Sequence, residues 1–189
     1  MPKTIIIDFD HTLFNAQLFK KAIAKALGMS LADWEKDYQK NKKKFTHYNY
    51  KQQIKNLPLA NQKKFLNILK NSNKYLYKDA IIFLRSIKNN KIILLSKGEP
   101  SLQEQKIINS GVKKYLQIKT TDRPKVEFIK KIKNKENIIF INDRGKEIDE
   151  IKKVYPNVYV IWVRRTNGQY KNEPCKKYDK KVNNLKIKL

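Results

Sequence analysis

Two carboxylates separated by one residue, Asp8 and Asp10, follow the apolar run Ile5, Ile6 and Ile7. Three consecutive β-branched residues are typical of a strand buried on both faces of a parallel sheet. Ligands of open α/β sheets bind at the carboxyl ends of such strands. Because two neighbouring acids repel each other, the pair needs a compensating partner. A metal ion, or a division into nucleophile and proton carrier, would supply one, and a polar turn with a helix-capping Asp is the alternative.

Polar side chains also follow later apolar runs. They are Ser96 and Lys97 after residues 92–95, the loop with Arg123 and Lys125, and Asp143 after residues 138–141, followed by Glu147. If the strands are parallel neighbours, all of these ends meet at one crevice. Acids, a hydroxyl and a lysine gathered in one place suit a divalent cation and a phosphoryl group.

The chemistry of these groups suggests a role for each. Mg²⁺ prefers oxygen ligands and is commonly held by one or two carboxylates, for which Asp8 and Asp143 are the candidates. A carboxylate can attack phosphorus and form an aspartyl-phosphate, while Asp10 protonates the leaving oxygen and then activates water. Ser96 and Lys125 would hold the phosphoryl oxygens and offset their charge.

Together these residues resemble the four motifs of the haloacid dehalogenase-like (HAD) phosphohydrolases. The motifs stand here as Asp8-Phe9-Asp10-His11-Thr12, Ser96, Lys125, and Asp143 with Glu147. They occur in the family's order and span residues 5–149, most of the chain. Two positions depart from the common pattern. Asn142 precedes Asp143 where many relatives have Gly, and Arg123 stands before Pro124, so Arg123 is an alternative to Lys125 as the third-motif residue.

The resemblance implies Asp8 as nucleophile and Asp10 as general acid and base. It implies Mg²⁺ held by the carboxylates of Asp8 and Asp143 and by the main-chain carbonyl of Asp10. The remaining implied site residues are Ser96, Lys97 and Lys125 for phosphate, Thr12 for the loop, and Glu147 behind the metal ligands. Because dehalogenases of this superfamily lack the second Asp, Asp10 favours phosphoryl chemistry.

The order of the apolar patterns predicts an α/β protein. Residues 15–75 carry helical patterns without a strand signal, whereas strands and helices alternate from residue 78 onwards, as in a parallel sheet with right-handed crossovers. We expect a Rossmann-like three-layer core, residues 1–14 and 76–189, with a small all-helical cap of the C1 type, residues 15–75. The tail, residues 164–181, is expected to be irregular.

The net charge of +26 invites a nucleic-acid interpretation, because phosphate contacts drive non-specific binding. However, only five of the 43 basic residues are arginine, the side chain better suited to phosphate and base edges. We therefore expect a Mg²⁺-dependent phosphomonoesterase for a small phosphorylated metabolite or nucleotide. The alternatives are a polynucleotide end phosphatase, a basic nucleic-acid-binding protein, and a phosphotransferase or phosphomutase.

The composition also favours a location. The single cysteine, Cys175, excludes an internal disulfide framework and fits a reducing compartment. No apolar run approaches the roughly 20 residues of a membrane span, and the first apolar run begins at Ile5 without a signal-peptide pattern. We expect a soluble cytoplasmic protein that has no membrane partner.

Overall fold

A parallel β-sheet forms the centre of the molecule in the computed structural model, which describes residues 3–44 and 48–189. In the described residues its order is β3-β2-β1-β4-β5-β6, and every neighbouring pair is parallel. The strands are β1 (Thr4–Ile7), β2 (Lys91–Lys97), β3 (Gln117–Thr121), β4 (Ile138–Asn142), β5 (Tyr159–Val163) and β6 (Lys180–Val182). The central position of β1 explains its unbroken apolar sequence, because both faces and both edges of this strand are covered.

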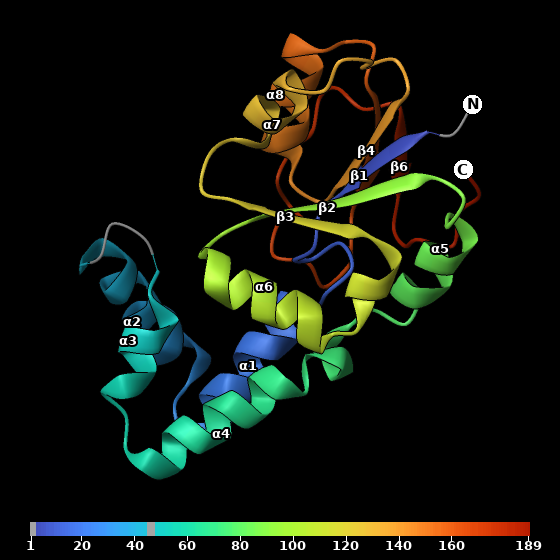
Figure 1. Ribbon diagram of the computed structural model, residues 1–189. Helices are drawn as coiled ribbons and strands as arrows, with labels where there is room; N and C mark the ends of the chain where they lie inside the picture. The colour runs from blue at the N-terminus through green and yellow to red at the C-terminus, as the bar shows by residue number, and fades with distance from the viewer. Residues whose placement is uncertain (1–2, 45–47) are drawn as a thin grey trace.

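Helices cover both faces of the sheet, and a further group of helices lies between β1 and β2 in the chain (Figure 1). This insert contains α1 (Ala16–Ala26), α2 (Leu31–Lys44), α3 (Tyr50–Lys55), α4 (Leu59–Lys70) and the 3₁₀ turn η1 (Ser72–Tyr75). The other helices are α5 (Ala80–Ser86), α6 (Pro100–Asn109), the 3₁₀ turn η2 (Val112–Tyr115), α7 (Lys125–Lys130) and α8 (Gly145–Val154). The architecture is therefore the predicted Rossmann-like α/β core with a helical insert after the first strand.

Successive side chains of β1 point to opposite faces of the sheet and belong to two separate layers of the core. Ile5 and Ile7 point to the face covered by α5 and α6, where the apolar cluster continues into the insert through Phe19 and Phe65. Ile6 points to the opposite face, which α7 and α8 cover (Figure 1). Because the insert shares its core with one face of the sheet, its helices are held above the carboxyl edge of that sheet.

The chain leaves the sheet and returns to it along a short antiparallel contact. Phe14 and Leu76 form an isolated β-bridge, and Asn15 N–H donates to Tyr75 O at 2.7 Å. Asn15 then caps α1, because its side-chain oxygen accepts from Leu18 N–H at 3.0 Å. The two connections between core and insert therefore lie side by side, directly after the residues that carry the first motif.

The tail differs from the sequence-based expectation. Residues 164–179 have no regular secondary structure, but Lys180–Val182 forms β6, which pairs with the edge of β5 at Ile161–Val163. Two lysines in a three-residue strand hide the strand pattern, and they also suit an exposed edge, where charge discourages further pairing. In the part of the chain that the structure describes, no helix has the length and apolar character needed to cross a membrane.

Candidate active site

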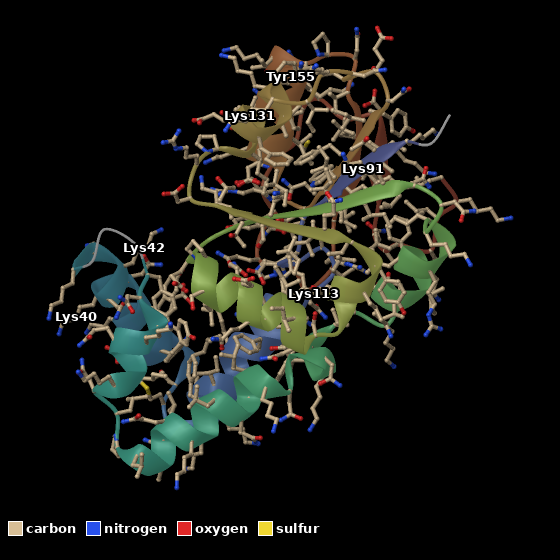
Figure 2. The ribbon with its side chains drawn as sticks, viewed as in Figure 1. Lys40, Lys42, Lys91, Lys113, Lys131 and Tyr155 are labelled. Atoms are coloured by element: carbon tan, nitrogen blue, oxygen red, sulfur yellow. The ribbon has the colours of Figure 1, made fainter. Side chains whose placement is uncertain are left out.

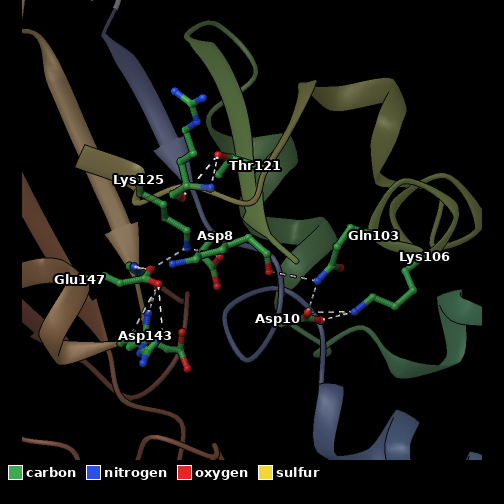
Figure 3. Close-up of polar contacts among 12 residues, drawn as sticks. Asp8, Asp10, Gln103, Lys106, Thr121, Lys125, Asp143 and Glu147 are labelled. Carbon is green, nitrogen blue, oxygen red and sulfur yellow. Dashed lines mark hydrogen bonds and ion pairs between the residues drawn. The ribbon is translucent and has the colours of Figure 1, made fainter. Parts of the chain in front are cut away.

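Asp8 lies at the carboxyl end of β1, where the neighbouring strands also end. Lys125, the first residue of α7, donates from Nζ to Asp8 Oδ1 at 2.5 Å and pairs with Glu147 Oε2 at 3.0 Å (Figure 3). The side chain of Lys125 is only 3% exposed and that of Asp8 8%. Because a desolvated ammonium requires anionic partners, these contacts account for a lysine that is buried at the start of a helix.

Asp143 lies directly after β4, the strand next to β1 in the sheet. Its main chain is held on both sides, since Asp143 N–H donates to Asn142 Oδ1 at 2.9 Å and Trp162 Nε1–H donates to Asp143 O at 3.0 Å. Asn142 also donates to Glu147 Oε2 at 2.9 Å. The Asn that departs from the common Gly at this position therefore orients both Asp143 and Glu147.

The positive charge of Lys125 does not fully offset the burial of Asp8 and Asp143. Burial raises the pKa of Asp8, and Lys125 offsets this only in part. Burial and repulsion by Asp8 raise the pKa of Asp143, whose Oδ2 atom has no hydrogen-bond partner among the described residues. Two buried carboxylates that repel each other, one with a free oxygen, fit a divalent cation.

The main chain would have to contribute to such a site. Among the described residues, no three or more His, Cys, Asp or Glu side chains gather as they would in an all-protein metal cage. Mg²⁺ commonly keeps several waters and takes only one or two carboxylates. Asp8 and Asp143 therefore supply two carboxylates suitable for Mg²⁺, and the resemblance implies the main-chain oxygen of Asp10 as a further ligand.

The side chain of Asp10 lies apart from this acidic pair and is bound by α6 (Figure 3). Lys106 Nζ donates to both carboxylate oxygens at 2.8 Å, and Gln103 Nε2 donates to Oδ2 at 2.8 Å. Burial tends to raise the pKa of Asp10, but the charge and hydrogen bond of Lys106 outweigh it and lower the pKa. Asp8 and Asp10 are therefore placed in different environments, as two carboxylates with different roles require.

Of the other predicted residues, Ser96 and Lys97 line the cavity at this site, whereas Thr12 and Arg123 are not among the described residues that line it. Ser96 is buried near the end of β2, and Lys97 follows it with an exposed side chain. Thr12 is fully buried, and its carbonyl oxygen accepts from Arg165 Nη2 at 2.8 Å. Arg123 points away from the site, because its side chain is 75% exposed and pairs only at 3.7 Å with Glu127. Of the two third-motif candidates, the structure therefore brings Lys125 to Asp8.

A cavity of about 610 Å³ separates these residues from the helical insert. Its core wall includes Asp8, Asp10 and Asp143, and its opposite wall includes Trp34 and Tyr38 of α2. A volume of this size is typical of small-molecule sites. The insert therefore covers the carboxyl edge of the sheet and leaves a cavity large enough for a small molecule.

Several residues that line this cavity were not singled out by the sequence. Gln103 and Lys106 recur on one face of α6, and Gln169 and Tyr170 come from the irregular tail. The ring of Tyr170 meets the ring of His11 edge-on at 5.9 Å. Gln103, Lys106 and the buried Ser110 are polar residues at helical spacing, a pattern that could have indicated a polar face on this helix. Nothing in the tail sequence marks Tyr170 as part of the site.

Sequence comparison does not identify relatives of this chain. No model of a known protein family matches it, and none of the curated proteins matches it by sequence. The fold, in contrast, is shared with many solved structures, of which three are described next.

The three structures align with nearly the whole chain. A haloacid dehalogenase-like hydrolase from Burkholderia xenovorans is 14% identical, with a TM-score of 0.70 over 96% of this chain and 92% of its own. The HAD-hydrolase YfnB from Bacillus subtilis, solved with bound magnesium, is 12% identical, with a TM-score of 0.66 over 97% and 95%. L-2-haloacid dehalogenase from Xanthobacter autotrophicus is 14% identical, with a TM-score of 0.64 over 98% and 96%.

These likenesses show that the chain has the HAD-like hydrolase fold, with the helical insert in the position of the cap. The identities are too low to carry an activity from any of these proteins. Structures of this fold include an L-2-haloacid dehalogenase and proteins described only as hydrolases. The chemistry therefore has to be argued from the side chains of this chain.

Proposed function

We propose that this protein is a Mg²⁺-dependent phosphohydrolase that acts through an aspartyl-phosphate on Asp8. The observation that carries the proposal is the meeting of Asp8, Lys125, Glu147 and Asp143 at the wall of the cavity, while Lys106 holds Asp10 at a separate position on the same wall. A buried carboxylate next to an ammonium and a second, separately held carboxylate is the arrangement that a nucleophile and a proton carrier require.

In the first step an oxygen of Asp8 attacks phosphorus while the bond from phosphorus to the leaving oxygen breaks. Lys125 lies within hydrogen-bond distance of Asp8 and offsets charge on the transferring group. Asp10 gives a proton to the leaving oxygen, which departs as an alcohol. Because Lys106 lowers the pKa of Asp10, only the protonated fraction of this side chain is active in the step. The products of this step are the aspartyl-phosphate and the carboxylate of Asp10.

In the second step Asp10 takes a proton from water, and the water oxygen attacks phosphorus. The bond between Asp8 and phosphorus breaks, which releases inorganic phosphate and restores both side chains. Asp8 and Asp143 would hold Mg²⁺ with the main-chain oxygen of Asp10. The bound ion would supply positive charge to the phosphoryl oxygens and lessen the repulsion between the two carboxylates.

Asp10 favours phosphoryl chemistry over dehalogenation. Halide is a leaving group that needs no proton, whereas the oxygen of a phosphomonoester does. The chain has a carboxylate at position 10 and contacts it with three hydrogen bonds from α6. A site built for halide release would have no use for this group.

The proposal is tested by the hydrolysis of p-nitrophenyl phosphate with and without Mg²⁺, by wild type and by Asp8→Asn. We expect metal-dependent release of phosphate in wild type and none above background in the variant, which removes the nucleophile's charge at nearly constant volume. Activity retained by a folded Asp8→Asn variant would overturn the mechanism. No activity of the Mg²⁺-loaded wild type on this ester or on a panel of sugar phosphates and nucleotides would overturn the function.

A further inference from the structure

Only two lysines are buried in the part of the chain that the structure describes, Lys125 and Lys106. Lys125 belongs to the third motif and contacts the nucleophile. Lys106, which is 5% exposed, belongs to none of the motifs and lies in the middle of α6. A buried ammonium is costly to desolvate, so its position calls for an explanation.

The ammonium of Lys106 lies among aromatic rings that come from three parts of the molecule. Its Nζ is 5.7 Å from the ring centroid of Phe9, 5.3 Å from that of Phe14 and 5.8 Å from that of Phe19. These rings belong to the first motif, the connection to the cap and cap helix α1. Cation–π attraction from several faces stabilises the charge and leaves the ammonium little freedom to move.

Asp10 is the anionic partner of this ammonium. Lys106 binds both oxygens of Asp10 at 2.8 Å, and the side chain of Asp10 is 25% exposed, on the side of the cavity. One edge of the carboxylate is therefore fixed by α6 while part of it faces the substrate space. The contacts leave the proton-carrying group accessible but restrict its rotation.

Gln103 is a second residue of α6 that holds the Asp10 carboxylate, and Gly98, in the loop after β2, leaves room for its side chain. Gln103 Nε2 donates to Asp10 Oδ2 at 2.8 Å and to Lys97 O at 3.3 Å. A Cβ atom at Gly98 would come within 2.6 Å of Gln103 Nε2. Glycine at this position is therefore explained by the close approach of the Gln103 side chain to the loop.

Stability alone does not explain this cluster. An apolar pair of similar volume is often as stabilising as a buried ion pair, because two charges need not be desolvated. A lysine surrounded by phenylalanine rings would be simple to replace by an apolar residue if packing were its only role. The pairing with Asp10, a residue of the cavity wall, points instead to the site.

We propose that Lys106 is the positioning residue of Asp10: together with Gln103 it fixes the carboxylate for proton transfer to and from the leaving oxygen. This inference rests on the proposed phosphohydrolase function and deepens it. Since one of the rings around Lys106 belongs to cap helix α1, the orientation of Asp10 also depends on the cap being seated on the core.

The test compares substrates whose leaving oxygens differ in their need for a proton. The leaving group of p-nitrophenyl phosphate departs as a stable phenolate, whereas the leaving oxygen of an alkyl phosphate must be protonated. We expect Lys106→Met to lower kcat/KM for the alkyl ester by about 100-fold and for the nitrophenyl ester by less than about fivefold. The exposed Lys113→Met, on η2, is the matched control and should change neither value.

A double-mutant cycle separates positioning from general damage. If Lys106 acts only through Asp10, Lys106→Met combined with Asp10→Asn should lose no more alkyl-ester activity than Asp10→Asn alone, within about twofold. Equal losses on both esters, or losses that multiply in the double variant, would overturn the proposal. Should Lys106→Met fail to fold, Gln103→Met replaces it, with the same selectivity and a loss of about tenfold.

A structural readout keeps the inference separate from the activity on which it rests. If wild type hydrolyses no phosphate ester, the proposed function fails, and crystal structures of wild type and Lys106→Met decide the positioning claim. A carboxylate of Asp10 that rotates away or loses its order in the variant supports it. An unchanged Asp10 rotamer in the variant overturns it.

Discussion

The wall of the cavity and the rest of the surface differ sharply in charge. Seven of the chain's 17 acidic residues line the cavity, but only six of its 43 basic residues do. The cavity wall is therefore close to neutral, and the whole positive excess lies outside it. Figure 2 shows this excess distributed over the molecule, with Lys40 on the cap, Lys91 at the start of β2 and Lys131 beyond α7.

Four of the six cations that line the cavity form ion pairs with individual acidic side chains. Lys125, Lys106, Lys20 and Arg144 each pair with an acidic side chain at 2.5–3.8 Å. The net charge of +26 thus says little about the site, where both buried ammonium groups have specific acidic partners. A basic exterior acts through its summed field, whereas the cavity acts through individual contacts.

Lys125 and Arg123 provide the largest test of this difference, because they are two residues apart and differ mainly in burial. Lys125→Met should lower kcat/KM by about 1,000-fold, since it removes the ammonium that contacts Asp8 and leaves Asp8 and Glu147 without its charge. Arg123→Met should change kcat/KM by less than about twofold, since an exposed pair contributes little. Steady-state kinetics on p-nitrophenyl phosphate, with thermal unfolding as a check on folding, measure both.

Similar losses in these two variants would contradict the contrast between interior and exterior. So would a folded Lys125→Met that keeps its activity, because the proposed role of the buried ammonium requires a large loss.

A second buried pair, Asp79 with Arg165, allows the same comparison for stability. Arg165 donates to Asp79 from both terminal guanidinium nitrogens at 2.7 and 2.9 Å, and Leu185 N–H donates to Asp79 at 2.7 Å. Asp79→Ala should lower the free energy of unfolding by about 3 kcal/mol, because Arg165 stays buried without its partner. Glu127→Ala, which breaks the exposed pair with Arg123, should cost at most about 0.5 kcal/mol. Urea unfolding at neutral pH measures both values.

The same pair predicts a pH dependence. Burial tends to raise the pKa of Asp79, but the hydrogen bonds of Arg165 and Leu185 outweigh it and lower the pKa. Because the folded pKa is depressed, the stabilisation is complete above the ordinary Asp value of about 3.9 and is lost as the pH falls through the folded value. Asp79→Ala should therefore remove part of the acid sensitivity of unfolding, and an unchanged acid limb of the stability profile would contradict this.

Asp143 tests the acidic side of the cavity through its metal requirement. Asp143→Asn keeps the volume and removes one of the two proposed carboxylate ligands. The Mg²⁺ concentration for half-maximal activity should rise by at least about tenfold. Removal of a side chain that only supports a metal ligand already weakens metal binding by about tenfold or more, and Asp143 is proposed as a ligand itself. Titration of phosphatase activity with Mg²⁺ after chelation measures the shift, and an unchanged midpoint would exclude Asp143 as a ligand.

The exterior lysines should give the smallest effect on turnover. The exposed residues Lys91, Lys113 and Lys131 lie outside the cavity lining (Figure 2). Their combined replacement by Gln should change kcat/KM for p-nitrophenyl phosphate by less than about twofold, while any non-specific DNA affinity falls and its salt dependence becomes shallower. A loss of turnover in proportion to the loss of DNA binding would instead support the nucleic-acid alternative.

The sequence was sufficient for the features that depend on local pattern. The apolar strands before Asp8, Ser96 and Asp143 have the predicted positions, and the helical insert falls between β1 and β2 as expected. Gly28 and Gly111 take the left-handed conformation that ends α1 and opens η2, as helix-terminal glycines commonly do. These features follow from residue type and spacing within one element.

Features that depend on contacts between distant elements could not be predicted in this way. Lys106 is one of 38 lysines, and only the packing of α6 against the first motif distinguishes it. Arg165 lies in a basic tail that was expected to be irregular, and nothing in the local sequence marks it as buried. Asp79 and Thr12, from other parts of the chain, bind it in the interior. In the sequence, a basic residue that will be buried cannot be distinguished from an exposed one, because its partners come from distant segments.

The most direct test of the central claim is the capture of the phosphorylated carboxylate. Wild type is mixed with p-nitrophenyl phosphate and Mg²⁺, quenched in acid and treated with borohydride, which reduces an acyl phosphate to the alcohol and so converts a phosphorylated Asp to homoserine. Peptide mass spectrometry should find homoserine at Asp8, increased in Asp10→Asn if the second step is slowed, and absent from Asp8→Asn. Turnover without modification of Asp8, or modification of another residue in its place, would contradict the account.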